Sequence, residues 1–410
     1  MVMKASSVSP AKEDRRGLAM VAALLAIFTT IFASNLPTPL YSFWQARWGF
    51  SSTALTAVFS IYVLGVVATL LTLGSLSDKL GRRQMMVPGL LFILGGAVTF
   101  MLAEGIYGLG IARILTGIGT GIVTGAASAA LVELEPNENW TRAATLSALF
   151  FTLGAFAGPT VSSLALFFGS GADIWPFMVV VALATGTIIL LLTAPWPAHI
   201  GQRQSNFRLR AWRPTTIKVP RELLGAFVFA AATICLAWST GSLYASLGPS
   251  LAMNLTGISD RAVAGLFAAA WQLMAGFSQF ACQRQPLNRL LIAGPSILIV
   301  GLMIMAASVL LSSPGLFALA TLATATGAGA TGVVAIASIS QVAPPAERGG
   351  IISAFYLMAY LTMASVVLGV GFTSDLIGFG TTVLGFTTLI SLAALALMIS
   401  AVRSGRATFW

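Results

Sequence analysis

The chain has 410 residues, of which 57% are hydrophobic and only 8% are charged, and its formal net charge is +10. A soluble domain carries about 25% charged residues because its surface faces water, so this composition excludes an ordinary soluble protein. The apolar excess requires lipid as its solvent, and the 41 glycines suit helices that pack closely within a membrane.

Apolar runs recur along the whole chain, each long enough to cross a hydrocarbon core of about 30 Å at about 1.5 Å per residue. They are continuously apolar and do not alternate, which favours helices over barrel strands. The sequence therefore predicts an all-α membrane protein with twelve transmembrane helices, the first of which is too long for a signal-peptide core. The predicted spans are 18–42, 53–76, 84–103, 106–132, 143–168, 175–196, 223–249, 261–282, 290–312, 315–341, 351–374 and 379–402.

The basic residues predict the orientation, since Lys and Arg gather in cytoplasmic loops. Of the 22 Lys and Arg, only Arg47 and Arg261 fall on one side of the predicted membrane, and Arg113 lies within a helix. All others share the side of the two termini. We therefore expect a multi-pass protein of the inner (plasma) membrane with both termini cytoplasmic. The positive charge is an orientation signal and does not indicate nucleic-acid binding.

The sharpest local pattern lies between the second and third predicted helices, where residues 74–83 read GSLSDKLGRR. Gly74 allows close helix approach, Gly81 allows a tight turn, and Asp78 can pair with a basic group or cap a helix. This loop resembles the G-x-L-x-D-x-x-G-R-R/K motif of the major facilitator superfamily. The resemblance implies two six-helix bundles and a gating role for Gly74, Asp78, Gly81, Arg82 and Arg83, which would hold the cytoplasmic side shut.

The fourth predicted helix carries Arg113, and residues 113–119 read RILTGIG. This segment looks like the superfamily's buried-arginine motif, which is found mainly in proton-linked members. An arginine inside a membrane helix is costly unless it faces a wet cavity or a partner, so we expect a coupling role. The alternative is an arginine that extends to the outer headgroups.

The fifth predicted helix contains GAFAGP at residues 154–159. Gly154 and Gly158 share a helix face and permit close packing, while Pro159 removes a backbone hydrogen bond and kinks the helix. The segment is similar to the core of the family's antiporter motif, although Ser162 and Ser163 stand where paired glycines are usual. The resemblance implies export by exchange. Packing alone is the alternative.

The longest internal polar stretch, rich in Arg, predicts a linker at 197–222 between an N-terminal bundle at 1–196 and a C-terminal bundle at 223–410. The halves repeat each other. Gly117, Gly119 and Gly121 recur as Gly327, Gly329 and nearby Gly332, at an offset of about 210, which places Ala323 opposite Arg113. The second half lacks the loop motif, so we expect gating and coupling to concentrate in the first six helices.

Proton coupling usually needs a carboxylate inside the membrane, and the predicted helices contain none at depth. The acids nearest the membrane are Glu104, Glu133, Asp173, Asp260 and Asp375, all at predicted helix ends. We interpret Glu133 and Asp375 as the best coupling candidates. The alternative is that either carboxylate only caps or orients its helix.

Aromatic and amide groups on cavity-facing helices can hold an amphiphile without fixing one geometry. The candidate substrate-binding residues are Asn35, Thr38, Tyr41, Tyr62, Trp238, Tyr244, Trp271, Gln272, Tyr356 and Tyr360. Tyr and Trp also form interfacial belts, and Tyr41, Trp44, Trp48, Trp175 and Trp196 suit that role.

The leading hypothesis is a proton-coupled antiporter that exports small hydrophobic or amphiphilic compounds by alternating access, as bacterial multidrug efflux carriers of the superfamily do. The alternatives are an importer or facilitator of a polar metabolite such as a sugar or organic acid, and a non-transporting membrane receptor or scaffold. No catalytic or metal-ligand cluster is present, so we expect neither an enzyme nor a metal or other cofactor. The expected partners are a small-molecule substrate, protons and membrane lipids, and the family resemblance implies a monomer.

Overall fold

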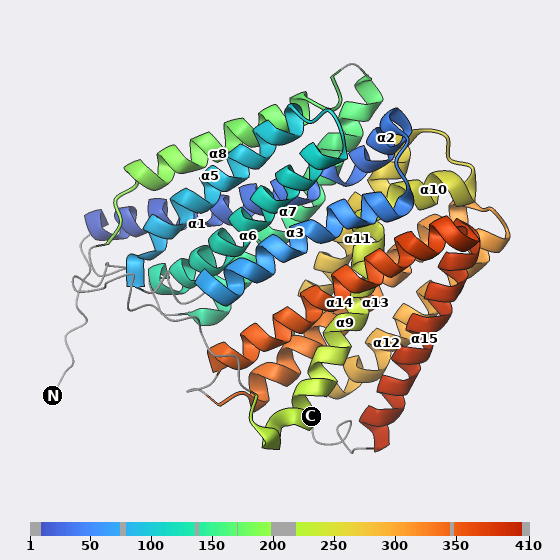
Figure 1. The fold of residues 1–410 in the computed structure, drawn as a ribbon. Helices are drawn as coiled ribbons and strands as arrows, with labels where there is room; N and C mark the ends of the chain where they lie inside the picture. The colour runs from blue at the N-terminus through green and yellow to red at the C-terminus, as the bar shows by residue number, and fades with distance from the viewer. Residues whose placement is uncertain are drawn as a thin grey trace.

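The computed structural model describes residues 10–73, 79–135, 139–169, 171–197, 219–344 and 348–403 (Figure 1). Nearly all of these residues are helical. The helices are α1 (Pro10–Asn35), α2 (Pro37–Trp48), α3 (Ser52–Leu73), α5 (Arg82–Met101), α6 (Ile106–Leu134), α7 (Trp140–Phe168), α8 (Trp175–Thr193), the 3-10 turn η2 (Arg221–Leu223), α9 (Leu224–Ser246), α10 (Gly248–Thr256), α11 (Arg261–Cys282), α12 (Leu287–Leu310), α13 (Pro314–Val342), α14 (Arg348–Ile377) and α15 (Phe379–Arg403).

The described residues contain 12 helical segments that are long and apolar enough to cross a membrane. This confirms the predicted all-α architecture with twelve transmembrane helices. The eighth span, at 261–282, agrees with the prediction at both ends, and the others differ by a few residues. The first span is the exception, because it runs from Arg16 to Trp48 and extends past the predicted end at residue 42.

The extension arises because the first membrane helix is broken and then continues. The break lies at Leu36, between α1 and α2. Pro37 and Pro39 lack the N–H groups that a continuous helix would bond to carbonyls one turn earlier. A second break, at Leu247 between α9 and α10, is followed by Pro249. Pro37 and Pro39 indicate the break at Leu36 in the sequence, whereas the hydropathy pattern alone does not.

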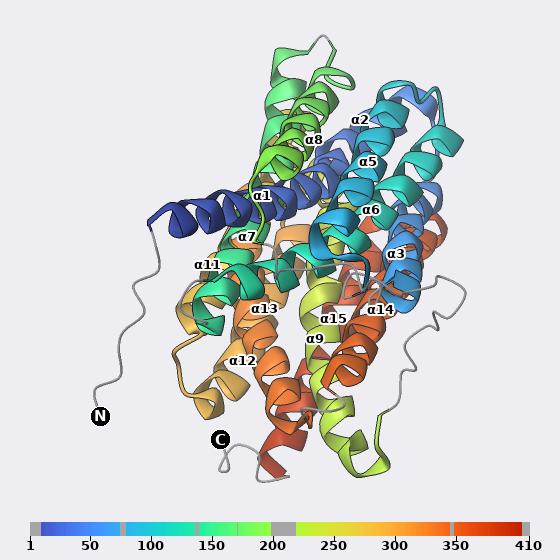
Figure 2. The ribbon, with the colours of Figure 1, turned by 90° about the vertical axis from the view of Figure 1, so that its left-hand side faces the viewer.

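The helices lie in two groups (Figure 1). The N-terminal group comprises α1 to α8, and the C-terminal group comprises η2 and α9 to α15. The groups come together at the end of the molecule that carries α2 and α10, which we call the α2–α10 end. They diverge toward the opposite end, where α9 begins and α15 ends. The view turned by 90° shows the same divergence (Figure 2).

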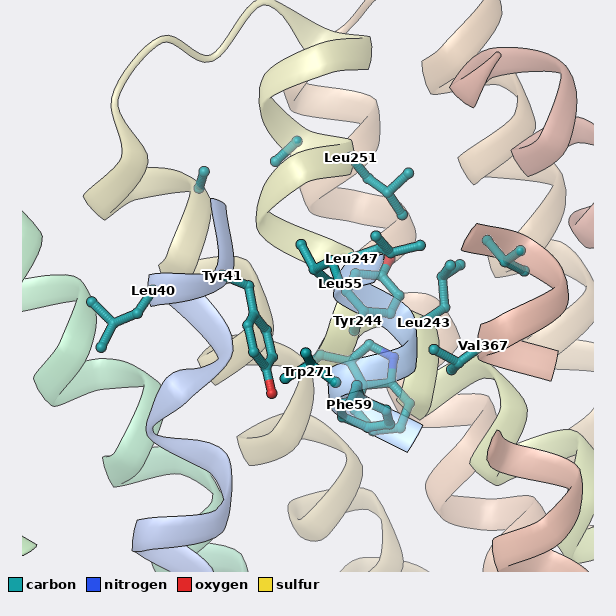
Figure 3. Packing of buried hydrophobic residues seen from close by; sticks show 14 of the residues in the cluster. Leu40, Tyr41, Leu55, Phe59, Leu243, Tyr244, Leu247, Leu251, Trp271 and Val367 are labelled. Carbon is teal, nitrogen blue, oxygen red and sulfur yellow. The ribbon is translucent and has the colours of Figure 1, made fainter. Parts of the chain in front are cut away.

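The buried side chains explain why the two groups join at one end. At the α2–α10 end a single hydrophobic cluster draws residues from both groups, including Tyr41, Phe59, Tyr244 and Trp271 (Figure 3). At the opposite end the clusters stay within one group. One packs the start of α1 against the end of α6, and another packs the start of α9 against the end of α13. The main hydrophobic cluster is therefore shared at the α2–α10 end, and beyond it a small cluster of Val63, Val67 and Ala364 also joins the two groups.

Helix–helix contacts fix the register of the internal repeat. The helices α6 and α13 both have 29 residues and begin at Ile106 and Pro314, an offset of 314 − 106 = 208. Glycine contacts with these helices agree with the offset: Gly96 of α5 packs on Thr116 of α6, and Gly301 of α12 packs on Thr324 of α13, which lies 324 − 116 = 208 positions later. The offset of about 210 inferred from the glycine pattern was therefore two residues too long. Thr321, and not Ala323, stands opposite Arg113.

Candidate transport site between the two helix groups

The seam is the surface along which α1, α2, α3 and α7 face α9, α10, α11 and α14. The predicted substrate-binding residues divide into two sets along it. Six side chains remain partly accessible: Asn35, Tyr62, Trp238, Gln272, Tyr356 and Tyr360. The other four are buried: Thr38, Tyr41, Tyr244 and Trp271. The first set is therefore partly open to contact in this conformation, whereas the second set packs the fold.

Amide groups meet across the seam beside the break in the first helix. The Gln272 Nε2 group donates to Asn35 Oδ1 at 3.2 Å, while Asn35 Nδ2 donates to the Ile31 carbonyl at 2.9 Å. Nearby, the hydroxyl of Thr38 donates to the Ala245 carbonyl at 2.9 Å. The structure thus brings together two residues that the sequence proposed separately, on helices 237 positions apart. Both amides keep capacity for further hydrogen bonds.

Four aromatic rings gather where α3, α9 and α14 meet. The ring of Trp238 lies edge-on to Tyr360, with centroids 4.9 Å apart, and 6.0 Å from Tyr356. Tyr62 and Tyr360 both pack on the small cluster of Val63, Val67 and Ala364, which joins the two groups. Edge-to-face aromatic arrangements of this kind accept flat apolar molecules from several directions. This aromatic set and the Asn35–Gln272 pair form the candidate substrate surface.

Arg113 lies deep inside the N-terminal group and is 1% exposed. Its Nε group donates to the Tyr41 hydroxyl, and Nη1 donates to the Ser34 carbonyl at 2.7 Å. The guanidinium carbon also lies 5.2 Å from the ring centre of Tyr41 and 5.3 Å from that of Tyr62. The arginine therefore holds the end of α1 just before the break. The alternative of a headgroup-facing arginine is wrong, because the side chain is enclosed by protein.

The glycines of the predicted kink motif on α7 contact the backbone of α1 directly. A Cβ atom on Gly154 would lie 2.7 Å from the Phe28 carbonyl oxygen, and one on Gly158 would lie 2.5 Å from the Phe32 carbonyl oxygen. Pro159 lies inside α7. One turn after Gly158, the hydroxyl of Ser162 donates to the Leu36 carbonyl at 2.5 Å. The serine that departs from the family pattern thus binds the break of the first helix.

Asp375 lies near the end of α14 and bonds to the start of α3, across the seam. Its carboxylate accepts the N–H groups of Ser52 at 2.9 Å and Thr53 at 2.8 Å, and the Thr53 hydroxyl at 2.6 Å. Asp260, in contrast, accepts the Ala262 N–H of its own helix at 2.7 Å. A carboxylate at a helix N-terminus is favourable because it satisfies free N–H groups and the helix dipole. Asp375 is therefore a cap supplied by one group to the other.

The loop-motif residues that the structure describes act within the N-terminal group. Gly81 has a φ of 104°, which favours glycine. Arg82 forms an ion pair with Glu133 at 2.8 Å, and Arg83 donates to the Leu192 carbonyl at 2.5 Å. Gly74 and Asp78 lie outside the described residues. Arg82, which the sequence proposes for gating, and Glu133, which it proposes for coupling, thus form one ion pair at the end opposite α2 and α10.

Sequence reasoning missed the partners that complete these contacts. Ser52 and Thr53 are common residue types without a distinctive pattern, so no sequence signal marked them, and Ser162 stood out only as a departure from the family motif. Glu135 was also missed. Its carboxylate is buried and pairs with Arg142 at 3.3 Å. Trp44, proposed for an interfacial belt, is 1% exposed and stacks on Phe100, so it belongs to the core.

Comparison with known proteins reveals relatives with different substrates. MdtD of Shigella boydii, whose name assigns it to multidrug resistance, is 27% identical over 241 residues, covering 58% of this chain and 44% of that protein. The chloramphenicol resistance protein CraA of Acinetobacter baumannii is 26% identical over 40% of this chain and 39% of its own length. The 4-hydroxybenzoate transporter PcaK of Pseudomonas putida is 28% identical over 34% of this chain and 32% of its own length. Each match thus spans less than half of the relative.

Solved structures share the whole fold at low sequence identity. A bacterial homologue of the human lysosomal transporter Spinster, solved in an inward-facing and unoccupied conformation, has a TM-score of 0.74 and 13% identity, over 96% of this chain and 98% of that one. The family model of the Major Facilitator Superfamily matches residues 23–367. The chain is a multi-pass membrane transporter and not an enzyme, and it belongs to the Major Facilitator Superfamily.

Proposed function

We propose that this transporter exports small hydrophobic or amphiphilic compounds by alternating access, in exchange for protons. The observation that carries the proposal is the convergence of partly accessible aromatic and amide side chains from both helix groups. Trp238 and Tyr360 offer flat apolar faces, and Asn35 and Gln272 offer hydrogen bonds about the break of the first helix. A surface of this composition suits amphiphiles of varied shape.

The one-sided closure supports alternating access. Since basic residues mark the cytoplasmic side, the α2–α10 end faces outward, both termini lie in the cytoplasm, and the protein resides in the plasma membrane. The shared hydrophobic cluster and the Asp375 cap then close the outer side. For transport to occur these contacts must break while the opposite ends of the two groups approach each other.

The Asp375 cap also suggests how protons could drive the cycle. Its carboxylate accepts hydrogen bonds from α3 as an anion. Because the donors of Ser52 and Thr53 stabilise the anion while the outer end is closed, a proton binds this carboxylate only once that end has opened, and its binding would then delay re-formation of the cap. Asp375 would thus couple proton binding to the conformational change, whereas Glu133 serves the ion pair with Arg82.

Export as the direction of transport is supported by the α7 motif, which resembles the family's antiporter motif and whose glycines pack closely on α1 near the break. The relatives named for drug resistance point to export as well. Uptake of an organic acid is the second candidate, because PcaK is named as a 4-hydroxybenzoate transporter and because the N-terminal group carries a buried arginine. A receptor or scaffold without transport activity is disfavoured, since the relatives with assigned names are a transporter and resistance proteins.

The test is flux in vesicles reconstituted with purified protein, after a thermal-shift screen that identifies stabilising compounds. Uptake into inside-out vesicles that is stimulated by an acidic interior would support proton-driven export. Equal flux with and without the pH gradient would leave facilitated passage, and the absence of flux for every stabilising compound would favour a receptor.

A further inference from the structure

Arg113 is a buried cation whose hydrogen-bonding capacity is not filled. Its Nε and Nη1 groups donate to Tyr41 and to the Ser34 carbonyl, while Nη2 has no partner among the described residues. A guanidinium has five N–H donors, so three of them are unused. An enclosed polar group without partners is costly. This combination points to a group that joins the arginine during the transport cycle.

No described acid neutralises this charge. Glu133 pairs with Arg82, Asp173 with Arg47 and Glu135 with Arg142. Asp375 and Asp260 cap helices, and Glu104 and Glu222 are exposed. The second half of the repeat has no acid at the equivalent position either. Thr321 stands there, and the hydroxyl of the nearby Thr324 bonds to Tyr244. The cation is therefore uncompensated within the part of the chain that the structure describes.

Aromatic rings surround the guanidinium of Arg113, and one of them also belongs to the candidate substrate surface. Its guanidinium carbon lies within 5.7 Å of the ring centres of Tyr41, Phe59 and Tyr62, and ring faces attract cations. Arginine stays protonated in proteins. Tyr62, which covers one side of the guanidinium, is partly accessible and packs on the cluster that also contacts Tyr360. Tyr62 therefore contacts both the guanidinium of Arg113 and the candidate substrate surface.

We propose that Arg113 recognises a negatively charged group on the substrate and that the transported compounds are small aromatic carboxylates or similar amphiphilic anions. The inference rests on the proposed transport function and names its substrate class. A carboxylate accepts two parallel N–H groups from the fork of an arginine, and Nη2 with the unused N–H of Nη1 provides such a pair. The rings of Tyr62, Trp238 and Tyr360 then bind the aromatic body. A cationic drug, in contrast, would be repelled by Arg113.

The test compares three compounds with the same ring system and different charge on purified full-length protein: 2-naphthoate, 2-naphthamide and 2-naphthylmethylammonium. We expect the carboxylate to raise the unfolding temperature most, the neutral amide less and the cation not at all. In Arg113→Gln the advantage of the carboxylate over the amide should disappear, and Arg113→Lys should retain part of it. Arg47→Gln, which removes an exposed cation paired with Asp173, should leave the order unchanged.

The charge series on the unaltered protein decides the matter even if the Arg113 variants fail to fold. An amide that stabilises as well as the carboxylate, or a cation that stabilises best, would overturn the proposal. So would a carboxylate preference that persists in Arg113→Gln. Vesicle flux separates this inference from the general function, because transport of the amide or cation without transport of the carboxylate refutes anion recognition and leaves the transporter intact.

Discussion

The carboxylate of Asp375, near the end of α14, accepts both the backbone N–H and the hydroxyl of Thr53 at the start of α3, at 2.8 and 2.6 Å. These residues belong to different halves of the repeat and lie 322 positions apart in the sequence. The contact therefore exists only while the α2–α10 end is closed. It provides a direct way to test whether that closure breaks and re-forms during transport.

The first prediction concerns Asp375→Asn, which removes the charge and keeps the size of the side chain. A weaker cap costs about 1 kcal/mol, which corresponds to about a fivefold larger population open at the α2–α10 end. The measurement is the rate at which a membrane-impermeant maleimide labels Ser60→Cys, in a background without Cys235 and Cys282. Ser60 is 5% exposed and its hydroxyl donates to the Ala364 carbonyl across the seam.

The control for this experiment is Asp173→Asn. Asp173 pairs with Arg47 at the same end, but both residues belong to the N-terminal group. Its loss should leave the labelling rate of Ser60→Cys unchanged. Equal labelling in the Asp375 variant and the unaltered background, or an equal rise in both aspartate variants, would contradict the assignment of Asp375 as a cap across the seam.

The second prediction concerns the close contact between α7 and α1. In Gly158→Ala the new Cβ atom would lie 2.5 Å from the Phe32 carbonyl oxygen and 2.9 Å from the Leu36 nitrogen. Backbone atoms cannot move aside as a flexible side chain can, so we expect a loss of about 1–3 kcal/mol in stability. The measurement is the apparent unfolding temperature in detergent.

Gly186→Ala is the matched control, because Gly186 lies in a helix of the same group and a Cβ atom there would meet nothing within 4 Å. That change should be neutral or slightly stabilising, since alanine favours helices over glycine by up to about 1 kcal/mol. If the two alanine variants unfold at the same temperature, α7 and α1 do not pack as described.

The third prediction compares two adjacent serines. Ser162 donates to the Leu36 carbonyl, whereas the hydroxyl of Ser163 has no hydrogen-bond partner among the described residues. Ser162→Ala should therefore lower stability by about 1 kcal/mol, because it leaves a carbonyl at the break unpaired. Ser163→Ala should be neutral or stabilising, since it removes a buried hydroxyl that bonds to nothing. The reverse order in thermal unfolding would refute the role given to Ser162.

The fourth prediction concerns the ion pair between Arg82 and Glu133. Its side chains are 13% and 34% exposed, and partly exposed pairs contribute about 1 kcal/mol or less. Glu133→Gln should therefore barely change the unfolding temperature but slow flux in vesicles, because the pair joins α5 to α6 at the end opposite α2 and α10. Flux should still respond to a pH gradient.

A charge exchange provides the control for this pair. Combining Arg82→Glu with Glu133→Arg should recover much of the flux lost in either single variant, since the attraction is restored with its sign reversed. If Glu133→Gln instead abolishes the response to the pH gradient, Glu133 and not Asp375 is the proton-coupling residue.

Much of the fold could be predicted from the sequence because each membrane helix is specified locally. A hydrocarbon core of fixed thickness requires about 20 apolar residues per crossing, so hydropathy found the twelve spans within a few residues. The loop motif at residues 74–83 and the glycine pattern near Arg113 predicted the family, which the match to residues 23–367 confirmed. The helix clasp at Gly154 and Gly158 was predicted too, since small residues four positions apart permit close approach.

The sequence by itself thus determined the class of the protein, its membrane helices and the identity of a deeply buried cation. The tertiary structure alone decided what those residues contact. It showed that Asp375 caps α3, that Asn35 bonds to Gln272, and that Tyr360 is partly accessible whereas Tyr244 is buried. The physical reason is that hydropathy depends on each residue and its neighbours in the chain, whereas these contacts depend on how two helix groups pack over hundreds of positions. A hydrogen bond between residues 35 and 272 leaves no local pattern to read.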